Sequence, residues 1–306
     1  MWGGATFAAL LTLAVIVTRA SRCEESTPPP ILSHSPAGSR CPSVNDGSLK
    51  LMTLNVAHGR GNGINQVFQS AKRISENVDA IGALLRRVAP DVAVLQEADG
   101  SSFWSGDFNH VSSLAEKGGF SHSVHGLNVK GAGIAFGTAI LSRRLPDDAR
   151  CVTFDPSPPT FSKGFVSASL PFEDDPASRV TVVSAHLDFS RNSVREKQVQ
   201  KMVETLEGRI GPPVILGDFN AAWEEGSPVR TLARRLRLKA YKPEEKGHIT
   251  FPTLKTRLDW VLISEDLEFV SHEILPDVVS DHLAAVAVVR KKARDNREQG
   301  GKPPKR

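Results

Sequence analysis

Short apolar runs recur along the chain from residue 48 to residue 290. Six of them predict strands, because they are brief, rich in β-branched residues and bounded by turn residues: "LKLMTLNV", "DVAVLQE", "GTAILSR", "GFVSASL", "RVTVVSAHLD" and "VIL". Three later runs predict further strands: "RLDWVLIS", "LEFVSHEIL" and "LAAVAVVRK". No Pro/Gly-rich linker interrupts this span, so we expect a single domain over residues 48–290.

Two longer segments repeat apolar residues at helical spacing. The first predicts an amphipathic helix that ends at Pro90, and its apolar positions are Ile74, Val78, Ile81, Leu85 and Val88. The second runs from Val194 to Ile210, just before the strand "VIL". "HVSSLAEKG" and "SPVRTLARRL" predict two short helices. Interspersed strands with few crossover helices indicate an α/β fold of mixed sheets with helices outside.

The N-terminal end departs from this pattern. Residues 5–17 form an apolar run too short to span a bilayer comfortably, and small residues follow it in "TRA". We therefore expect residues 1–22 to be a secretory signal peptide, with a retained membrane anchor as the alternative. Residues 23–47, with "STPPP" and "HSPAGSRCPS", predict a flexible linker. These features predict an exported protein, either periplasmic or secreted.

Charge separates the C-terminal end from the body. Residues 291–306 hold seven Lys and Arg against two acidic residues and predict a basic disordered tail. Without this tail and the first 22 residues, the remaining chain has a net charge of −3. Net charge therefore gives no support to a basic groove for nucleic acid. The tail could still attract the protein, which we expect to be a monomer, to anionic surfaces.

The three cysteines do not form a disulfide framework. Cys23 and Cys41 could pair after export, which would leave Cys151 unpaired. The chain contains no Cys/His cluster with zinc spacing, so a zinc site is not expected.

Polar and ionisable residues stand at the ends of the predicted strands. In "PPVILGDFN" a buried apolar run gives way to Asp218 and Asn220, at the place where α/β proteins usually carry their chemistry. A polar turn would explain this stretch taken alone. Polar or ionisable residues also stand next to the ends of other predicted strands: Asn55, Glu97, His186, Asp259, Asp281 and His282. Because buried carboxylates without partners are costly, such a cluster predicts a cation or hydrogen-bonded histidines.

Seven motifs occur in a fixed order across residues 51–289: "LNVAHG", "LQEAD", "GTAILSR", "SAHLDFSRNSVREKQV", "VILGDFN", "LDWVLIS" and "VSDHLAAVAVV". In this order they resemble the endonuclease/exonuclease/phosphatase superfamily of DNase I-like proteins, in an exported bacterial-type form. The resemblance implies an α/β fold, a four-layer αββα sandwich of two mixed β-sheets flanked by helices. It also implies a site at one edge of the sheets.

The resemblance further implies a role for each strand-end residue. A divalent cation, Mg²⁺ or Mn²⁺, would be held by Glu97 with help from Asn55 and Asp281, and an oxygen-only ligand set suits these ions. The remaining residues would act on water and phosphate: Asp218 activates or positions the water, Asn220 orients it, and His186 and His282 stabilise phosphoryl charge. Asp259 or Asp281 would fix the tautomer of His282. Several relatives carry a carboxylate where this chain has Ala57. This difference leaves open whether the site binds one metal ion or two.

Other polar residues fit structural roles better. For His58 and Arg60 a Gly-rich turn is favoured over a contact with substrate phosphate. Trp104 either lines the cleft or packs in the interior. The remaining residues are expected to be structural or at the surface (His110, His122, His125) or to tie a helix to the sheet (Arg195, Gln198).

These observations favour an exported, divalent-metal-dependent phosphodiesterase. Its substrate would be a phospholipid head group or a similar diester, with a nuclease acting on DNA or RNA as the alternative. A catalytically silent binding module on the same fold is the non-enzymatic alternative. A calcineurin-like metallophosphatase also uses a "GD" strand end, but it needs a downstream "GNH" that this chain lacks.

Overall fold

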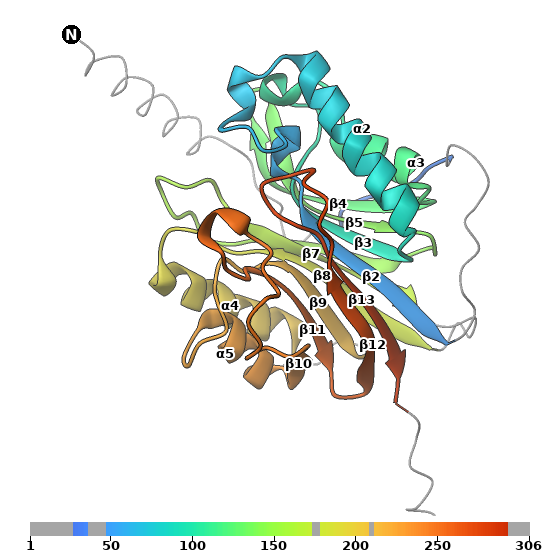
Figure 1. Cartoon of the computed structure of the whole chain (residues 1–306), viewed down its shortest axis with the longest axis vertical. Helices are drawn as coiled ribbons and strands as arrows, with labels where there is room; N and C mark the ends of the chain where they lie inside the picture. Colours follow the sequence, from blue (N-terminus) through green and yellow to red (C-terminus); the bar gives the residue numbers. More distant parts are fainter. Residues whose placement is uncertain (1–26, 36–46, 173–177, 208–210, 293–306) are drawn as a thin grey trace, which may run out of the picture.

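The computed structural model describes residues 27–35, 47–172, 178–207 and 211–292. Within these residues two mixed β-sheets pack face to face, and helices cover their outer faces (Figure 1). This arrangement is the predicted four-layer αββα sandwich. The expected signal peptide and nearly all of the basic tail lie outside the described residues. Among the described residues, no helix has both the length and the apolar character that crossing a membrane requires.

The first sheet contains seven strands. Their spatial order is β1 (Ile31–Ser33), β4 (His122–Gly131), β5 (Ile134–Ser142), β3 (Val92–Asp99), β2 (Ser48–Asn55), β13 (Ala285–Lys291) and β12 (Leu267–Ile274). Strands β2 and β3 are parallel, and the other neighbours are antiparallel. The outer face is covered by α2 (Ala71–Val88) and α3 (His110–Gly118) (Figure 1).

The second sheet contains six strands. Their order is β10 (Leu238–Ala240), β11 (Asp259–Ser264), β9 (Pro213–Asp218), β8 (Arg179–His186), β7 (Gly164–Pro171) and β6 (Asp147–Thr153). Its parallel pair is β8 and β9, and its outer face is covered by α4 (Asn192–Leu206) and α5 (Pro228–Arg235). In each sheet the parallel pair therefore brings two carboxyl ends to the same edge.

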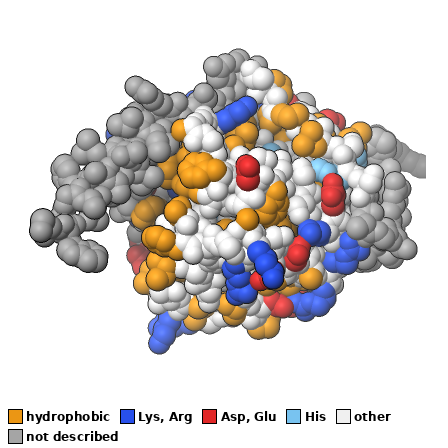
Figure 2. Space-filling view, turned by 90° about the horizontal axis from the view of Figure 1, so that it is seen from above, with side chains coloured by type: hydrophobic (Ala, Val, Ile, Leu, Met, Phe, Trp, Pro, Cys, Tyr) orange, Lys and Arg blue, Asp and Glu red, His pale blue; other side chains and the backbone are white. Residues whose placement is uncertain are grey.

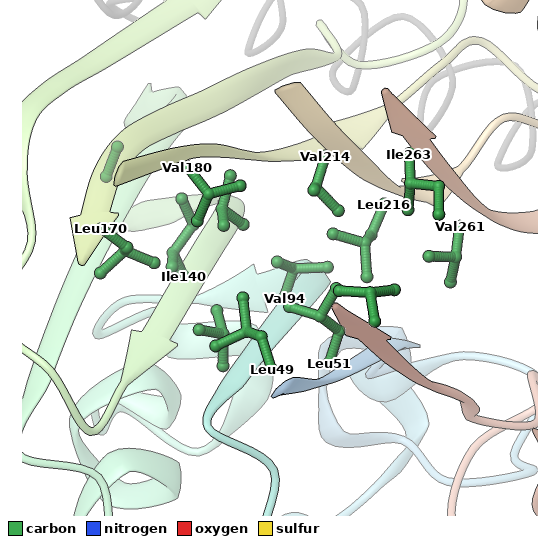
Figure 3. Packing of buried hydrophobic residues seen from close by; sticks show 14 of the residues in the cluster. Leu49, Leu51, Val94, Ile140, Leu170, Val180, Val214, Leu216, Val261 and Ile263 are labelled. Atoms are coloured by element: carbon green, nitrogen blue, oxygen red, sulfur yellow. The ribbon is translucent and has the colours of Figure 1, made fainter. Parts of the chain in front are cut away.

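Along the central strands of each sheet, side chains alternate between the core that fills the space between the sheets and the core beneath the covering helices. One set fills the space between the sheets and comes from both of them: Leu49, Leu51, Val94, Ile140, Leu170, Val180, Val214, Leu216, Val261 and Ile263 (Figure 3). The alternate positions face the helices, such as Met52 and Leu54 beneath α2, and Val183 and Ile215 beneath α4. Burial on both faces explains why these strands read as continuous apolar runs in the sequence.

Helix α2 has the boundaries that its capping residues favour. The Ser70 hydroxyl accepts a hydrogen bond from the Arg73 amide at the start, and Ala89 adopts a left-handed conformation at the end, before Pro90. The predicted apolar stripe is buried against the sheet. Helix α4 ends at Leu206, earlier than the apolar repeat predicted, and Ile210 lies outside the described residues.

Four strands were not predicted from the sequence. Strand β1 lies within the stretch expected to be a linker, where its backbone pairs with β4 although its side chains are exposed. Strands β4, β6 and β10 contain many polar residues or are very short, so apolar periodicity does not reveal them. In β6, Cys151 is disulfide-bonded, which corrects the expectation that it stays unpaired. Its partner lies outside the described residues.

Candidate active site

Asp218 ends β9 at the edge where the carboxyl ends of the parallel strands meet. The residue before it, Gly217, has φ 148°, and a Cβ there would lie 1.9 Å from the carbonyl oxygen of Ala185 on β8. Only glycine fits this close approach between strands. The pairing places Asp218 beside His186 on one side and Asp259 of β11 on the other.

The buried Asp218 carboxylate is the centre of a polar cluster. Its Oδ2 accepts a hydrogen bond from the amide nitrogen of Asn55 at 3.1 Å, and it lies 3.5 Å from Nε2 of His186 and 3.8 Å from Nε2 of His282. Its Oδ1 accepts a hydrogen bond from the backbone N–H of Asn220 at 2.9 Å. Both sheets therefore contribute side chains to one carboxylate.

His282 is oriented by a carboxylate on the opposite sheet. Its Nδ1 lies 2.8 Å from Oδ2 of Asp259, and its ring packs against Phe251. The hydroxyl of Thr250 accepts hydrogen bonds from the backbone N–H groups of Leu258 and Asp259, which fixes the start of β11. The Nδ1 hydrogen bond leaves Nε2 of His282 directed at Asp218. The structure thus supports Asp259, rather than Asp281, as the partner that orients His282.

The protonation states in this cluster follow from burial and neighbouring charge. Burial raises the pKa of Asp218 to about 7, the Asp259 carboxylate adds to this, and the positive charge of His282 opposes it. Burial alone would lower the pKa of His282, but Asp259 and Asp218 raise it to about 10. Burial and the charge of Lys163 hold the pKa of His186 well below its usual value. Near neutral pH the site therefore combines an imidazolium, a neutral imidazole and a carboxyl group that can exchange a proton.

Asn220 follows Asp218 in a left-handed conformation with φ 48°. Its side-chain amide donates a hydrogen bond to the carbonyl of Leu187 at 3.0 Å, which holds the residue over the end of β8. It stands beside Asp218, where its amide group could contact a water molecule or a phosphate group.

Glu97 enters the site through an irregularity in β3. The pairing with β5 shifts register between Leu95 and Ala98, and Glu97 has φ 48°. Its carboxylate lies 3.1 Å from Nη1 of Arg60, 3.4 Å from Nε2 of His58 and 3.7 Å from Nζ of Lys163. Burial alone would raise the pKa of Glu97, but His58, Lys163 and other nearby cationic groups outweigh it and hold the pKa well below its usual value.

Asp281 and Glu97 share one hydrogen-bond donor, the guanidinium of Arg60. The Nη2 group of Arg60 donates a hydrogen bond to Oδ2 of Asp281, while Nη1 of the same guanidinium donates to Glu97. The neighbouring Ser280 hydroxyl donates to the carbonyl oxygen of Asn55 at 2.7 Å. The loop before β13 is thereby tied to the end of β2, so the Glu97–Asp281 pair and the Asp218 cluster form one continuous site.

Two groups of side chains could hold a divalent cation. Glu97 and Asp281 both contact the Arg60 guanidinium, and hard carboxylate oxygen donors such as theirs suit Mg²⁺ or Mn²⁺. Asn55 lies nearby, but its side-chain oxygen accepts a hydrogen bond from the Ala57 N–H. Ligand atoms of Asp218, Asp259 and His282 also lie within 4.8 Å of one another, and Oδ1 of Asp259 has no hydrogen-bond partner in the part of the chain described. The Glu97–Asp281 group offers only oxygen donors, which Mg²⁺ and Mn²⁺ prefer, whereas the second group includes an imidazole nitrogen.

Sequence reasoning underestimated His58 and Arg60, because a glycine-rich stretch resembles a simple turn. In the structure His58 bridges Glu97 and Asp99, with its Nδ1 2.6 Å from Oδ1 of Asp99. Trp104 donates a hydrogen bond to the same carboxylate at 2.8 Å and packs against His58. Asp99 and Lys163 were missed altogether. Asp99 follows Glu97 by two residues in "LQEAD", which was the available signal; Lys163 lies in a loop with no such pattern.

Several structural predictions are confirmed. The side chain of Gln198 accepts a hydrogen bond from the Asp188 N–H, and Arg195 donates to the Asp188 carbonyl, so both tie α4 to the end of β8. His110 is buried and His125 is partly buried, and both hydrogen-bond to backbone carbonyls. Asp188 itself fixes the following turn by accepting hydrogen bonds from Ser190 and the Arg191 N–H.

Comparison with known proteins identifies relatives of this fold. The sequence profile of the endonuclease/exonuclease/phosphatase family matches residues 52–282. An endonuclease/exonuclease/phosphatase from Beutenbergia cavernae has a TM-score of 0.62 at 19% identity, covering 80% of this chain and 72% of that one. The human Nocturnin catalytic domain with bound sulfate has a TM-score of 0.60 at 17% identity, covering 87% of this chain and 100% of that one. Beta toxin from Staphylococcus aureus has a TM-score of 0.52 at 17% identity, covering 78% and 99%. No curated protein sequence matches the chain.

Proposed function

Since the chain belongs to the endonuclease/exonuclease/phosphatase family, we propose that it hydrolyses a phosphodiester by attack of water on phosphorus. One observation carries this proposal. The Asp218 carboxylate, with a pKa near 7, lies 3.8 Å from the imidazolium of His282, which Asp259 orients. A proton acceptor beside a fixed cation is the arrangement that water attack on an anionic diester requires.

Each residue of the Asp218 cluster has its own role in the proposed reaction. Asp218 takes a proton from the attacking water as the oxygen–phosphorus bond forms, and Asn220 and Asn55 position the reacting groups around it. His282 stabilises the negative charge that grows on the phosphoryl oxygens, and the neutral His186 contributes a hydrogen bond. The bond from phosphorus to the leaving oxygen then breaks, and this oxygen takes up a proton from solvent to depart as the alcohol. A positioned base of this kind typically contributes on the order of 10²–10⁴-fold to the rate.

A divalent cation, Mg²⁺ or Mn²⁺, would be held by Glu97 and Asp281, with Asn55 near them. When bound, it would neutralise charge on the phosphate group and so favour attack by water. The family to which the chain belongs typically uses a divalent metal. Both carboxylates lie in the site, and their oxygen donors fit these ions.

Exposed apolar residues around the site support a lipid substrate. Among the described residues, seven of the eleven exposed large hydrophobic side chains lie on loops or short 3-10 helices at the edge that carries the site: Ile64, Val67, Phe68, Phe103, Phe189, Leu254 and Val278. We call these seven residues the apolar rim. Ile64 is 98% exposed and Phe68 84% exposed, and exposure on this scale points to an interaction surface. On the face seen from above, hydrophobic side chains are exposed among charged ones (Figure 2).

The apolar rim suits a phospholipid surface better than a polynucleotide. Four of its seven members are aliphatic, whereas stacking on bases needs aromatic rings. Exposed cations stand near three of its loops: Lys72 after Phe68, Arg191 after Phe189, and Lys255 after Leu254. Apolar side chains together with Lys and Arg are the combination that binds anionic phospholipid head groups.

Two features support export. Residues 5–17 retain the character of a signal-peptide apolar core, and Cys151 is disulfide-bonded, which is typical of proteins in an oxidising compartment. We therefore propose a periplasmic or secreted enzyme, with retention through the N-terminal segment as the alternative.

A substrate screen tests the proposal. Purified protein, produced with export, should be incubated with a small soluble phosphodiester, sphingomyelin and phosphatidylcholine vesicles, DNA and RNA, each with Mg²⁺, with Mn²⁺ and with a chelator. We expect diester cleavage that needs the metal and is lost in Asp218→Asn, with lipid as the preferred substrate. Preferred cleavage of DNA or RNA would support the nuclease alternative. No cleavage of any diester by a folded, metal-supplied protein would support a binding module instead.

A further inference from the structure

The guanidinium of Arg60 lies between the two carboxylates that fit the metal. Its Nη1 contacts Oε2 of Glu97 at 3.1 Å, and its Nη2 hydrogen-bonds to Oδ2 of Asp281. The side chains of all three residues are largely buried, with exposed fractions of 16%, 17% and 22%. Arg60 thus provides the positive charge that these two carboxylates share.

The surrounding chain holds Arg60 in this position. Its Nε donates a hydrogen bond to the carbonyl of Gly63 at 3.1 Å, and its own carbonyl accepts one from the side chain of Gln69 at 2.7 Å. All three residues of the preceding η1 turn (Ala57–Gly59) have positive φ, and two of them, Ala57 and His58, are not glycine. The loop is therefore built to present the guanidinium to the two acids.

A divalent cation and the Arg60 guanidinium cannot share this position. Mg²⁺ requires oxygen ligands at about 2.0–2.1 Å and tolerates little distortion of its octahedral geometry. A guanidinium that donates to the same oxygens takes up the lone pairs that the metal needs, and it repels the metal as a like charge. Glu97 also lies close to His58 and Lys163, but neither of them contacts Asp281 in the described structure.

We propose that Arg60 is a built-in competitor of the divalent metal at Glu97 and Asp281. The metal enters only when Arg60 releases both carboxylates, so the strength of this double ion pair sets the metal affinity of the site. This inference rests on the proposed metal-dependent function and names the residue of this chain that tunes it. It assigns Arg60 a role in metal loading rather than in the chemical step.

Metal titration of matched variants tests the competition. Binding of Mn²⁺ alone should be measured by isothermal titration calorimetry for the wild type, Arg60→Gln, Arg60→Lys, Lys163→Gln and Arg150→Gln. Arg60→Lys keeps the charge but loses the two-armed bridge, whereas Lys163→Gln removes one charge near Glu97 and keeps the bridge. Arg150 is exposed and pairs with Asp148 on β6, so its variant controls for a distant loss of charge.

We expect Arg60→Gln and Arg60→Lys to bind Mn²⁺ at least about tenfold more tightly than the wild type, because a charge-assisted double contact no longer competes. Lys163→Gln should tighten binding less than Arg60→Lys does, and Arg150→Gln should match the wild type. Unchanged or weaker binding in both Arg60 variants would overturn the competition. So would a Lys163→Gln effect as large as that of Arg60→Lys, since general electrostatics would then suffice.

Thermal unfolding provides the second measurement. Without metal, Arg60→Gln should unfold at a lower temperature than the wild type, because Glu97 and Asp281 lose their shared cation. Saturating Mn²⁺ should raise its unfolding temperature more than it raises that of the wild type. If Mn²⁺ raises the unfolding temperature equally in the wild type and in Arg60→Gln, the role of Arg60 is contradicted while the proposed metal-dependent function is not. Absence of Mn²⁺ binding in every variant, including the wild type, would instead overturn the metal-dependent function and the inference with it.

Discussion

Oδ2 of Asp259 and Nδ1 of His282 lie 2.8 Å apart, and the hydrogen bond between them joins the two sheets of the sandwich. Asp259 begins β11 of the six-stranded sheet, and His282 lies just before β13 of the seven-stranded sheet. The charge state of the candidate site therefore depends on how the two sheets pack.

Asp259→Asn should lower kcat about 10²-fold or more while KM changes little. The carboxamide keeps the size of the side chain but removes the charge that raises the pKa of His282, so the imidazolium is lost from the transition state. The measurement is steady-state kinetics on a small soluble diester, with Asp277→Asn as the control because that carboxylate is partly exposed and pairs with Arg87. An equal loss in both variants, or an increase in KM alone, would exclude this role.

The rate should depend on pH in a bell-shaped manner. Asp218, with a pKa of about 7, must be deprotonated to accept a proton, so kcat/KM should rise as the pH increases through about 7. His282, with a pKa of about 10, must be protonated, so the rate should fall as the pH approaches 10. His282→Asn should remove the alkaline limb and move the acidic one to higher pH, because the charge that lowers the pKa of Asp218 is gone. A wild-type profile that is flat between pH 5 and 9 would refute the assignment of the base.

The apolar rim should bind phospholipid vesicles. Replacing both Ile64 and Phe68 with Asp should reduce the vesicle-bound fraction several-fold, because the substitutions remove apolar contacts and add charges that anionic lipid repels. Sedimentation with vesicles containing phosphatidylglycerol measures this fraction. Leu145→Asp is the matched control, since Leu145 is 61% exposed on the loop between β5 and β6, away from the site. If both variants bind as well as the wild type, the rim is not a lipid-binding surface.

His125 should make the protein less stable in mild acid. Burial lowers its pKa from 6.5 to about 4, so the unfolded chain takes up a proton more readily than the folded one. Its contribution is present above pH 6.5 and is lost as the pH falls from 6.5 toward 4, by up to roughly 3 kcal/mol in unfolding free energy.

Urea unfolding at pH 7, 6, 5 and 4 measures this loss. His125→Gln retains a side-chain donor for the Ala98 carbonyl but does not titrate, so its stability should fall less steeply over the same range. Parallel curves for wild type and variant would show that other groups cause the acid sensitivity.

Much of the fold could be predicted because its central strands are buried on both faces. Apolar runs such as "VTVVSA" and "VIL" identified β8 and β9, and the spacing of Ile74, Val78 and Ile81 identified α2. Strand β4 was missed because its sequence, "HSVHGLNVKG", mixes histidine, glycine and lysine with few apolar residues. Pairing with neighbouring strands, rather than local pattern, determines its conformation.

The candidate site could be predicted only where it follows strand ends. Asp218, His186 and Asp259 stand at the ends of strands that pair in register, so their meeting follows from topology. The positions of Arg60 and Lys163 depend on loop conformations that no periodicity encodes. A glycine-rich stretch allows many backbone paths, and only the folded structure shows that this one leads to Glu97.

The positive φ of Glu97 reduces the stability of the fold at a position proposed to be needed for activity. A glutamate at φ 48° adopts a backbone conformation that suits glycine, at a cost of about 1–3 kcal/mol for such a strained residue. Glu97→Gly would relieve this strain, but it would leave His58, Arg60 and Lys163 without their shared carboxylate and would delete the carboxylate proposed to hold the metal. Laboratory evolution that selects only for heat resistance should therefore introduce glycine here together with replacement of one or more of these cations, and yield more stable proteins without activity. Persistence of glutamate in such populations would mean that its ion pairs to His58 and Arg60 outweigh the backbone strain.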